Sequence, residues 1–290
     1  MTPQQMVESL PIWQGKVRVE PLGGGITNVN FVAQDAQRKL VVRIGDDIPV
    51  HQILRFNELS ASRAAHAAGV SPAVIYHQPG VLVIDYIEGK TQTRADFADD
   101  AVLDQALDLV ARAHRDIPHF LRGPALTFWV FHVLRDYAGT LRDGGSTYAT
   151  ALPGLLSEAA RLEAAVGAID LVFGHNDLLP ANFIHDGARM WLIDWDYAGF
   201  NSPLFDLGGL AANNGLTETQ EARMLGSYFD RAPDPGLWRR YRAMKAAAAL
   251  RETLWSMVSE AHSELDFDYA AYTASNLSTY RAAFAAFENS

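Results

Sequence analysis

The chain has 290 residues, of which 49% are hydrophobic and 20% charged, a balance typical of an ordered globular protein with one large domain or two ordinary ones. A net charge of −10 argues against a nucleic-acid partner, because contacts to phosphate backbones need clustered Lys and Arg. The absence of cysteine excludes disulfides, thiolate metal sites and a cysteine nucleophile. Neither a signal peptide nor an apolar run of membrane-spanning length is recognisable, so we expect a cytoplasmic protein without membrane insertion.

The first 88 residues have the pattern of a small sheet with one helix. Short segments rich in β-formers and punctuated by Gly and Pro predict five strands, at residues 17–20, 30–34, 40–44, 74–76 and 81–84. Between the third and fourth strands, apolar residues at helical spacing predict a helix over residues 53–68, which ends at Gly69. We therefore expect an N-terminal lobe, residues 1–88, built on a five-stranded antiparallel sheet.

From residue 99 onward the pattern is mostly helical. Apolar periodicity predicts helices at residues 101–115, 128–142, 155–166, 203–213, 217–231, 235–262 and 266–288. Three short strands interrupt them, at residues 171–173, 183–185 and 190–193. The fold class is therefore α+β, with a second, mostly helical lobe over residues 89–290.

The run LVFGHNDLLPANFIHDGARMWLIDWDYA, residues 171–198, concentrates polar side chains of catalytic type. Four residues separate Asp177 from Asn182, and the apolar strand MWLI leads directly into Asp194. One carboxylate of such a set can deprotonate a hydroxyl, while an amide oxygen and a second carboxylate bind the metal of a metal–triphosphate. The alternative is that each residue only caps a turn or ends a strand. We expect His175 to be structural, with its imidazole bonded to the loop backbone.

This run also carries a family resemblance. GHNDLLPANFI followed by LIDWDYAGFNSPLFDLG resembles the choline/ethanolamine kinase family, within the aminoglycoside-phosphotransferase-like group of enzymes with a protein-kinase-like fold. The resemblance covers nearly the whole chain and is strongest over residues 171–210. It implies ATP and Mg²⁺ as cofactors, Asp177 as the catalytic base, Asn182 and Asp194 as magnesium ligands, and Asp206 as a brace for the loop.

The N-terminal lobe supplies candidates for the nucleotide site. The segment LGGGITNVNF, between two predicted strands, lets the backbone approach phosphates closely, although a plain hairpin turn is the alternative. The backbone of Asp85 and Ile87, after the last predicted strand, is expected to hold the adenine ring. The resemblance places nucleotide contacts in the glycine-rich segment at Gly24, Gly25, Thr27 and Asn28.

The strand KLVVRIG departs from the pattern of many kinases, which place a Lys here to hold the α- and β-phosphates. This chain has Arg43, with Lys39 on the same face of the strand. Choline kinases characteristically carry an Arg at this point, so the resemblance implies that Arg43 binds phosphate and that Glu58 is its ion-pair partner. An exposed strand Arg and a solvated helical Glu are the alternatives.

Substrate candidates lie in the segment RETLWSMVSEAHSELDFDYAAY, which resembles the helix pair that lines the quaternary-ammonium pocket of choline kinases. Trp255 falls at the aromatic position, although an ordinary core Trp is equally consistent with the pattern. A quaternary ammonium has no N–H donors, so its recognition needs aromatic faces and nearby carboxylates. Asp196 and Glu252 are the candidate carboxylates and Tyr197 a further ring. Choline kinases often have a second Trp where this chain has Glu252.

Together these features predict a phosphotransferase that moves the γ-phosphoryl of ATP to the hydroxyl of a small cationic alcohol, with choline as the leading candidate. One alternative is a kinase of ethanolamine, thiamine or an aminoglycoside; an aminoglycoside pocket would be richer in carboxylates than in aromatics. Another is a catalytically silent nucleotide-binding protein. The presence of Asp177, Asn182 and Asp194 argues against that alternative.

Overall fold

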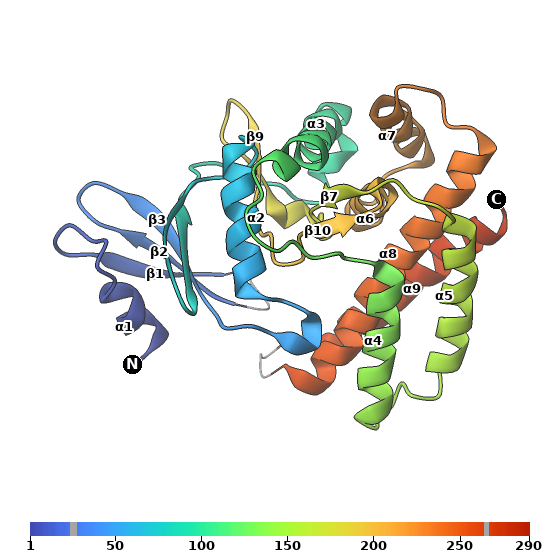
Figure 1. Ribbon diagram of the computed structural model, residues 1–290, viewed down its shortest axis with the longest axis horizontal. Helices are drawn as coiled ribbons and strands as arrows, with labels where there is room; N and C mark the ends of the chain where they lie inside the picture. Colours follow the sequence, from blue (N-terminus) through green and yellow to red (C-terminus); the bar gives the residue numbers. More distant parts are fainter. Residues whose placement is uncertain (24–27, 264–266) are drawn as a thin grey trace.

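The computed structural model describes residues 1–23, 28–263 and 267–290 and has two lobes (Figure 1). The N-terminal lobe contains the strands β1 (Arg18–Leu22), β2 (Val29–Gln34), β3 (Lys39–Ile44), β4 (Val74–Gln78) and β5 (Val81–Asp85), with helices α1 (Pro3–Glu8) and α2 (Arg55–Ala67). The strands lie in the order β1-β2-β3-β5-β4, and each neighbouring pair is antiparallel. The predicted five-stranded antiparallel sheet with an inserted helix is thus confirmed. The sequence analysis missed α1, which is too short for a helical period and begins at a capping box between Thr2 and Gln5.

The two faces of this sheet have different surroundings. Leu40 and Val42 of β3 are fully buried and belong to a hydrophobic cluster that includes Val7 of α1. Because side chains alternate along a strand, Val41 and Arg43 point to the opposite face. That face meets the C-terminal lobe across a cavity, so β3 carries its basic side chain toward the space between the lobes.

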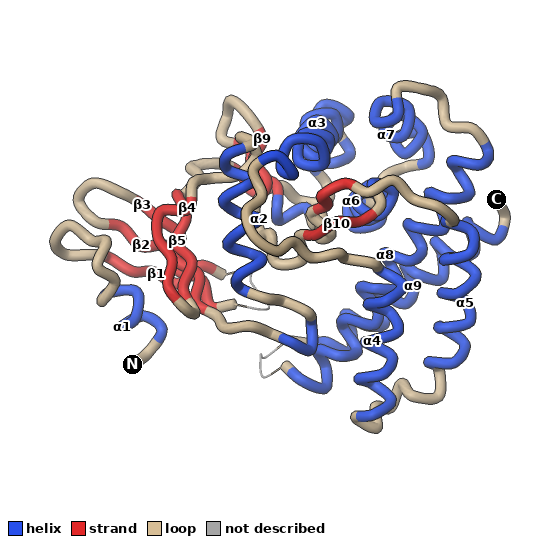
Figure 2. The backbone as a smooth tube through the Cα atoms, viewed as in Figure 1, coloured by secondary structure: helices blue, strands red, loops and turns tan. Residues whose placement is uncertain are grey.

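The C-terminal lobe is mostly helical, as predicted, and Figure 2 shows the long helices gathered on this side of the molecule. Its helices are α3 (Asp100–Asp116), α4 (Val130–Asp143), α5 (Leu152–Val166), α6 (Pro203–Asn214), α7 (Glu218–Phe229), α8 (Pro235–His262) and α9 (Tyr269–Glu288). Its short strands are β6 (Lys90–Thr91), β7 (Val172–Gly174), β8 (Phe183–His185), β9 (Met190–Leu192) and β10 (Gly199–Asn201). Sequence periodicity missed β6 and β10, because two or three residues are too few to show alternation. The described residues also form single 3-10 turns, η1 (Pro49–His51), η2 (Asp96–Ala98), η3 (Ile117–His119) and η4 (Pro180–Asn182).

Helix α8 lies at the centre of this lobe, where it packs against α4, α5, α6 and α9. Its contact with α6 is a close backbone approach. A Cβ added at Gly208 of α6 would lie 2.8 Å from the Cα of Lys245 in α8, so only glycine fits there without movement of a helix. This contact sets the distance between two helices that both contribute residues to the site described below.

Helix α2 joins the two lobes. Ala61 and Ala64 belong to the large hydrophobic cluster of the C-terminal lobe, although α2 precedes two strands of the N-terminal sheet. Hydrogen bonds just after α2 add to this packing. The backbone N–H of Leu192 donates to the carbonyl of Val70 at 3.0 Å, and the side-chain hydroxyl of Ser71 donates to the carbonyl of Leu192 at 2.8 Å. Division of the chain at residue 88 stays a prediction.

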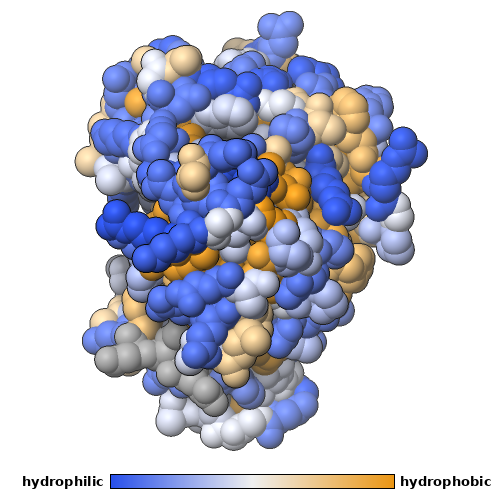
Figure 3. Space-filling model, turned by 90° about the vertical axis from the view of Figure 1, so that its left-hand side faces the viewer, coloured by the Kyte–Doolittle hydropathy of each residue, from blue (hydrophilic) through white to orange (hydrophobic). Residues whose placement is uncertain are grey.

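The surface shown in Figure 3 is largely hydrophilic, with hydrophobic side chains in patches between charged ones. Over the described ranges of the chain, none of the helices is both long and apolar enough to span a membrane.

Candidate active site

The loop that follows β7 is held at its start by a buried carboxylate. Asp206, in the first turn of α6, accepts the backbone N–H groups of His175 at 2.8 Å and Asn176 at 2.7 Å. His114 of α3 bonds the same carboxylate at 2.9 Å. Burial opposes the charge of Asp206, but the hydrogen bond and charge of His114 outweigh burial and hold the pKa of this carboxyl below its usual range. Asp206 therefore braces the loop, as the resemblance implied.

The imidazole of His175 connects the loop to the strand that precedes Asp194. Its Nδ1 accepts the backbone N–H of Asp177 at 3.2 Å, and its Nε2 donates to the carbonyl of Ile193 at 2.8 Å. A ring that accepts at one nitrogen and donates at the other is neutral, and burial lowers the pKa of His175 accordingly. This is the structural role expected for His175.

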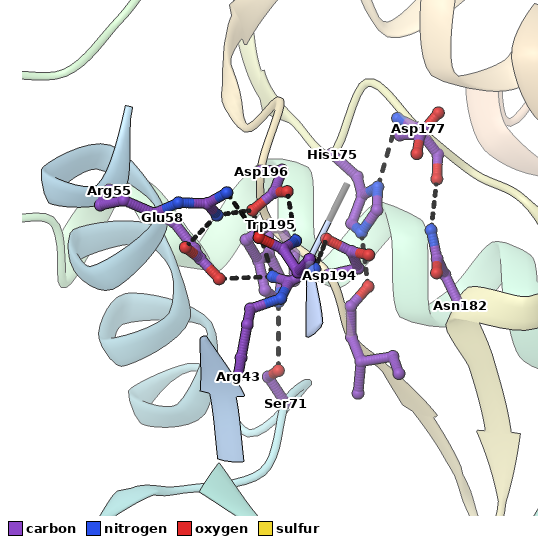
Figure 4. A network of polar contacts seen from close by, with 12 residues as sticks. Arg43, Arg55, Glu58, Ser71, His175, Asp177, Asn182, Asp194, Trp195 and Asp196 are labelled. Atoms are coloured by element: carbon purple, nitrogen blue, oxygen red, sulfur yellow. Dashed lines mark hydrogen bonds and ion pairs between the residues drawn. The ribbon is translucent and has the colours of Figure 1, made fainter. Parts of the chain in front are cut away.

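Hydrogen bonds to the backbone hold Asp177, Asn182 and Asp194 close together on the C-terminal lobe. The side-chain amide of Asn182 donates to the carbonyl of Asp177 at 2.9 Å, and the N–H of Ile193 donates to the carbonyl of Asn182 at 3.0 Å. Asp194 has a φ of 70°, a left-handed conformation that a non-glycine residue rarely adopts and that costs roughly 1–3 kcal/mol. Figure 4 shows the carboxylate of Asp194 between the Asp177–Asn182 pair and the arginines of the N-terminal lobe.

Arg43 of β3 makes ion pairs across the space between the lobes. Its Nη2 donates to Asp194 at 2.8 Å, and its Nη1 donates to Asp196 at 3.1 Å and to Glu58 of α2 (Figure 4). Burial alone would raise the pKa of Asp194, but the charge and hydrogen bond of Arg43 outweigh it, and the pKa is lowered. Lys39, on the same strand, bonds Glu88 at 2.6 Å instead, so Arg43 is the strand's cation in the cleft.

A second arginine completes this network. Arg55, at the start of α2, donates to Glu58 at 2.7 Å, to Asp196 at 2.9 Å and to the Oδ1 of Asn28 at 2.6 Å. Asn28 in turn donates to Asp196 at 3.3 Å. Burial is the main cause that raises the pKa of Asp196 to about 7, in spite of the attraction of Arg43. Arg55 was not predicted as a site residue from the sequence. Its position three residues before Glu58, on the same helical face, was the available signal.

A cavity of about 290 Å³ lies between the N-terminal sheet and the part of the C-terminal lobe that contains β8 and the residues after β9. Asp85 and Ile87 line it, and so do Asn182 and Asp194. A smaller cavity of about 110 Å³ shares Asp194 and extends the space to Arg43 and Glu58. The apolar part of the larger cavity is formed by Leu22, Val41, Ile84, Ile184 and Ile193. The cleft thus runs from the end of β5 to the ion network, and the candidates Gly24, Gly25 and Thr27 lie outside the described residues.

The donors at the floor of this cleft suit a hard divalent cation. Asn182 and Asp194 offer an amide oxygen and a carboxylate, and the bond from Asn182 to the Asp177 carbonyl turns its Oδ1 away from that carbonyl. Within residues 1–23, 28–263 and 267–290, no three His, Cys, Asp or Glu side chains are grouped so that they alone could hold a metal. Such a two-ligand set is what Mg²⁺ uses when phosphates and water supply the remaining ligands.

The carboxylate of Asp177 faces a cation from α8. Arg251 Nη1 lies 3.3 Å from Asp177 Oδ1 and donates to Glu252 at 2.9 Å. Burial raises the pKa of Asp177 to about 7, while the positive charge of Arg251 opposes this rise. Asp177 is therefore poised to exchange a proton near neutral pH. The sequence analysis missed Arg251, because a helical pattern around Trp255 does not indicate which neighbour reaches the loop.

Of the remaining substrate candidates, Tyr197 and Glu252 contact Arg251 next to Asp177, and Trp255 contacts Tyr197. Asp196 lies apart from them, in the arginine network. Trp255 donates from Nε1 to the hydroxyl of Tyr197 at 2.8 Å. Trp255 is buried and its ring packs at 5.1 Å from that of His51, while the guanidinium of Arg251 lies 4.1 Å from the ring centre of Tyr197. Glu252 accepts the hydroxyl of Tyr272 at 2.7 Å.

Known proteins that are similar to this chain are phosphotransferases and kinases. The model of the phosphotransferase enzyme family (APH) matches residues 18–244. Protein LicA of Haemophilus influenzae is 26% identical over 258 residues, which cover 85% of this chain and 75% of LicA. Ethanolamine kinase 2 of Mus musculus is 25% identical over 312 residues, covering 94% and 78%.

Solved structures lead to the same group. The structure of a choline/ethanolamine kinase family protein from Mesorhizobium loti has a TM-score of 0.79 and 28% identity, with 99% of this chain and 98% of that one covered. The fold also matches choline kinase LicA from Streptococcus pneumoniae, with a TM-score of 0.77, 21% identity and coverage of 99% and 98%. Because the family model matches most of its residues, this chain belongs to the phosphotransferase enzyme family, as a small-molecule kinase that is similar to choline and ethanolamine kinases.

Proposed function

We propose that this enzyme transfers the γ-phosphoryl of ATP to the hydroxyl of a small cationic alcohol, with Mg²⁺ as the metal cofactor. The observation that carries the proposal is the position of Asn182 and Asp194 at the floor of a cleft that also contains Arg43, with Asp177 bonded to Asn182. A nucleotide with its base near Ile87 would direct its phosphates toward these residues. The phosphoryl group would then lie between the metal ligands and the base.

The side chains in the cleft have separate roles in the proposed reaction. Asp177, in its ionised form, accepts the proton of the substrate hydroxyl and orients that oxygen toward the γ-phosphorus. Arg43 exchanges its bond to Asp194 for phosphate oxygens when the nucleotide enters, while Glu58 keeps its guanidinium in the cleft. Asn182 and Asp194 would hold magnesium, which would supply positive charge where negative charge develops during phosphoryl transfer.

The charge of the cleft favours a cationic acceptor. Five carboxylates face three guanidinium groups within the networks described above, so two negative charges are in excess when all are ionised. These groups are Glu58, Asp177, Asp194, Asp196 and Glu252, with Arg43, Arg55 and Arg251. Magnesium and a cationic alcohol would both reduce this excess.

Choline is the first candidate alcohol. Relatives of this chain carry choline kinase and ethanolamine kinase in their names. Tyr197 and Glu252 contact Arg251 next to the proposed base, and Trp255 bonds Tyr197. Aromatic side chains with a nearby carboxylate are the groups that bind a quaternary ammonium, each ring contributing roughly 0.5–2 kcal/mol.

Ethanolamine is the second candidate, and one observation favours it. The ring of Tyr197 already faces the guanidinium of Arg251, and Trp255 is buried against His51. A ring that already faces a guanidinium is a poor partner for a quaternary ammonium, whereas the carboxylate of Glu252 suits a primary ammonium that has N–H groups to donate.

The test is an ADP-release assay with Mg²⁺ and a panel of choline, ethanolamine, thiamine and two aminoglycosides. We expect choline and ethanolamine to stimulate ADP release well above the rate without an alcohol. Stimulation by thiamine or an aminoglycoside alone would overturn the substrate proposal and leave the kinase assignment in place. Absence of stimulation by every alcohol would contradict the proposed reaction.

A further inference from the structure

Arg251 is a buried cation whose neighbours are unusual for a core residue. Its side chain is 4% exposed, yet it lies in the interior of α8 next to two carboxylates. One of these carboxylates is Glu252, its neighbour in sequence, and the other is Asp177, which comes from the loop between β7 and β8. A single nitrogen, Nη1, contacts both of them. Arg251 thus links α8 directly to the base of the proposed reaction.

The guanidinium is held from several sides. Glu252 receives a second bond from the hydroxyl of Tyr272 in α9, at 2.7 Å, which fixes the carboxylate that Arg251 contacts. Tyr197 places its ring 4.1 Å from the guanidinium carbon, within range of a cation–π contact, and Phe128 lies farther away at 5.8 Å. The position of Arg251 is therefore determined by side chains from α8, α9 and the segment after Asp194.

Stability alone does not account for this arrangement. Nε and Nη2 of Arg251 are buried without a hydrogen-bond acceptor among the described residues, which costs free energy. Apolar residues of similar volume often replace buried ion pairs at no loss of stability. A buried arginine that is incompletely bonded, and that contacts the base of a reaction, points to a role in that reaction.

We propose that Arg251 is a positioning residue, which holds the carboxylate of Asp177 in the orientation needed to meet the substrate hydroxyl. The proposal rests on the proposed function of the site. The guanidinium of Arg251 attracts Oδ1 of Asp177 and so restricts rotation of the carboxylate about its side-chain bonds. The side-chain amide of Asn182 donates to the backbone carbonyl of Asp177 and holds the main chain that carries this side chain.

This position also connects base and substrate groups. Glu252 and Tyr197, both candidates for the substrate site, are the residues that hold Arg251. An alcohol bound against Glu252 and Tyr197 would shift the guanidinium of Arg251, and this shift would move the carboxylate of Asp177. Arg251 would then align the base in response to the bound alcohol.

The test compares three variants with the wild type, using whichever alcohol of the panel gives the highest turnover. R251M removes the charge at nearly constant length, R251K retains a charge that reaches one carboxylate, and R239M makes the same change at an exposed arginine of the same helix. For R251M we expect kcat to fall about 100-fold while KM for ATP changes less than threefold. In R251K, kcat should be at least tenfold higher than in R251M. In R239M, kcat should equal that of the wild type.

A second measurement does not depend on turnover. In crystal structures we expect the carboxylate of Asp177 to take a different rotamer in R251M and its original one in R251K, with the loop backbone unchanged. Equal kcat in R251M and the wild type, or an unmoved Asp177 in R251M, would overturn the positioning role. Lack of turnover by the wild type itself would overturn the proposed function, whereas the two crystal structures would still decide the role of Arg251.

Discussion

The loop from His175 to Asp196 and the helix pair α8–α9 both contribute to the cleft, but they are held in different ways. The loop is held mainly through its backbone. The carboxylate of Asp206 accepts two backbone N–H groups, and the side-chain amide of Asn182 donates to a backbone carbonyl. In the helix pair, side chains contact side chains, as Trp255 does with Tyr197. A site held by its backbone tolerates few changes, whereas a site built from side chains is easily altered. This difference fits a family with one reaction and several alcohols.

The comparison predicts two classes of mutational effect. Changes in the loop should lower kcat for every alcohol, because they disturb the reacting groups. Changes in the helix pair should mainly raise KM and alter the preference between alcohols. Arg251 is the exception, because it lies on α8 and contacts the base in the loop.

Replacement of Asp177, the proposed base, should have the largest effect. In D177N the amide cannot accept the hydroxyl proton, so kcat should fall about 10²–10⁴-fold. The affinity for a fluorescent ATP analogue, measured by titration, should change less than threefold, because Asp177 is not among the residues that line the nucleotide cavity. A variant with near-normal turnover would remove Asp177 from the mechanism.

Loss of the loop brace should have the next largest effect. D206N replaces one oxygen that accepts a backbone N–H by an amide that cannot accept, and the buried group left unpaired should cost about 1–3 kcal/mol. Urea unfolding measures this loss. We expect kcat to fall about 100-fold as the loop shifts. Unfolding free energy and kcat both equal to those of the wild type would show that the brace is dispensable.

The pH dependence tests the charge state of the base. The pKa of Asp177 is raised to about 7, and only its ionised form accepts a proton, so kcat/KM should fall tenfold for each pH unit below about 7 and level off above it. A profile that stays flat down to pH 5 would contradict a buried base.

The free energy of unfolding should depend on pH in the opposite direction, and should fall as the pH rises. A carboxyl whose pKa is raised on folding stabilises the protein in its neutral form, and this contribution disappears as the pH rises through about 7. D177N should therefore have a Tm a few degrees above that of the wild type at pH 8, and the difference should shrink at pH 5.5. The reverse trend would indicate that Asp177 is stabilised as an anion in the fold.

The smallest effect is expected in the helix pair. E252Q removes the charge and leaves one acceptor oxygen for two donors, the hydroxyl of Tyr272 and the guanidinium of Arg251, so KM for a cationic alcohol should rise about tenfold while kcat falls less than in R251M. The rise should be larger for ethanolamine than for choline, because the primary ammonium donates N–H groups to the carboxylate. Steady-state kinetics with both alcohols measures this, and E260Q, at an exposed position of the same helix, is the control. An equal rise in KM for both alcohols would contradict hydrogen bonds from the primary ammonium to Glu252 and would indicate only a general effect of charge.

The same difference between the two regions explains what the sequence could predict. Local spacing in the sequence predicts the strands and the long helices. It also predicts the set of Asp177, Asn182 and Asp194, because these residues lie close enough in the sequence for their pattern to be recognised. Contacts between distant segments do not follow from it. Nothing local indicates that Asp196 would face Arg43 and Arg55 of the N-terminal lobe, or that Arg251 would reach Asp177. The covered rings of Trp255 and Tyr197 also depend on helix packing and on His51, which is 204 residues away from Trp255 in the sequence.

The most direct test of the account is ³¹P NMR of the wild-type enzyme incubated with ATP, Mg²⁺ and either choline or ethanolamine. The account predicts that the γ-phosphate signal declines while an equal amount of a phosphomonoester of the added alcohol appears, and that D177N produces neither change. Conversion of ATP to ADP and inorganic phosphate alone, at the same rate with and without an alcohol, would contradict it.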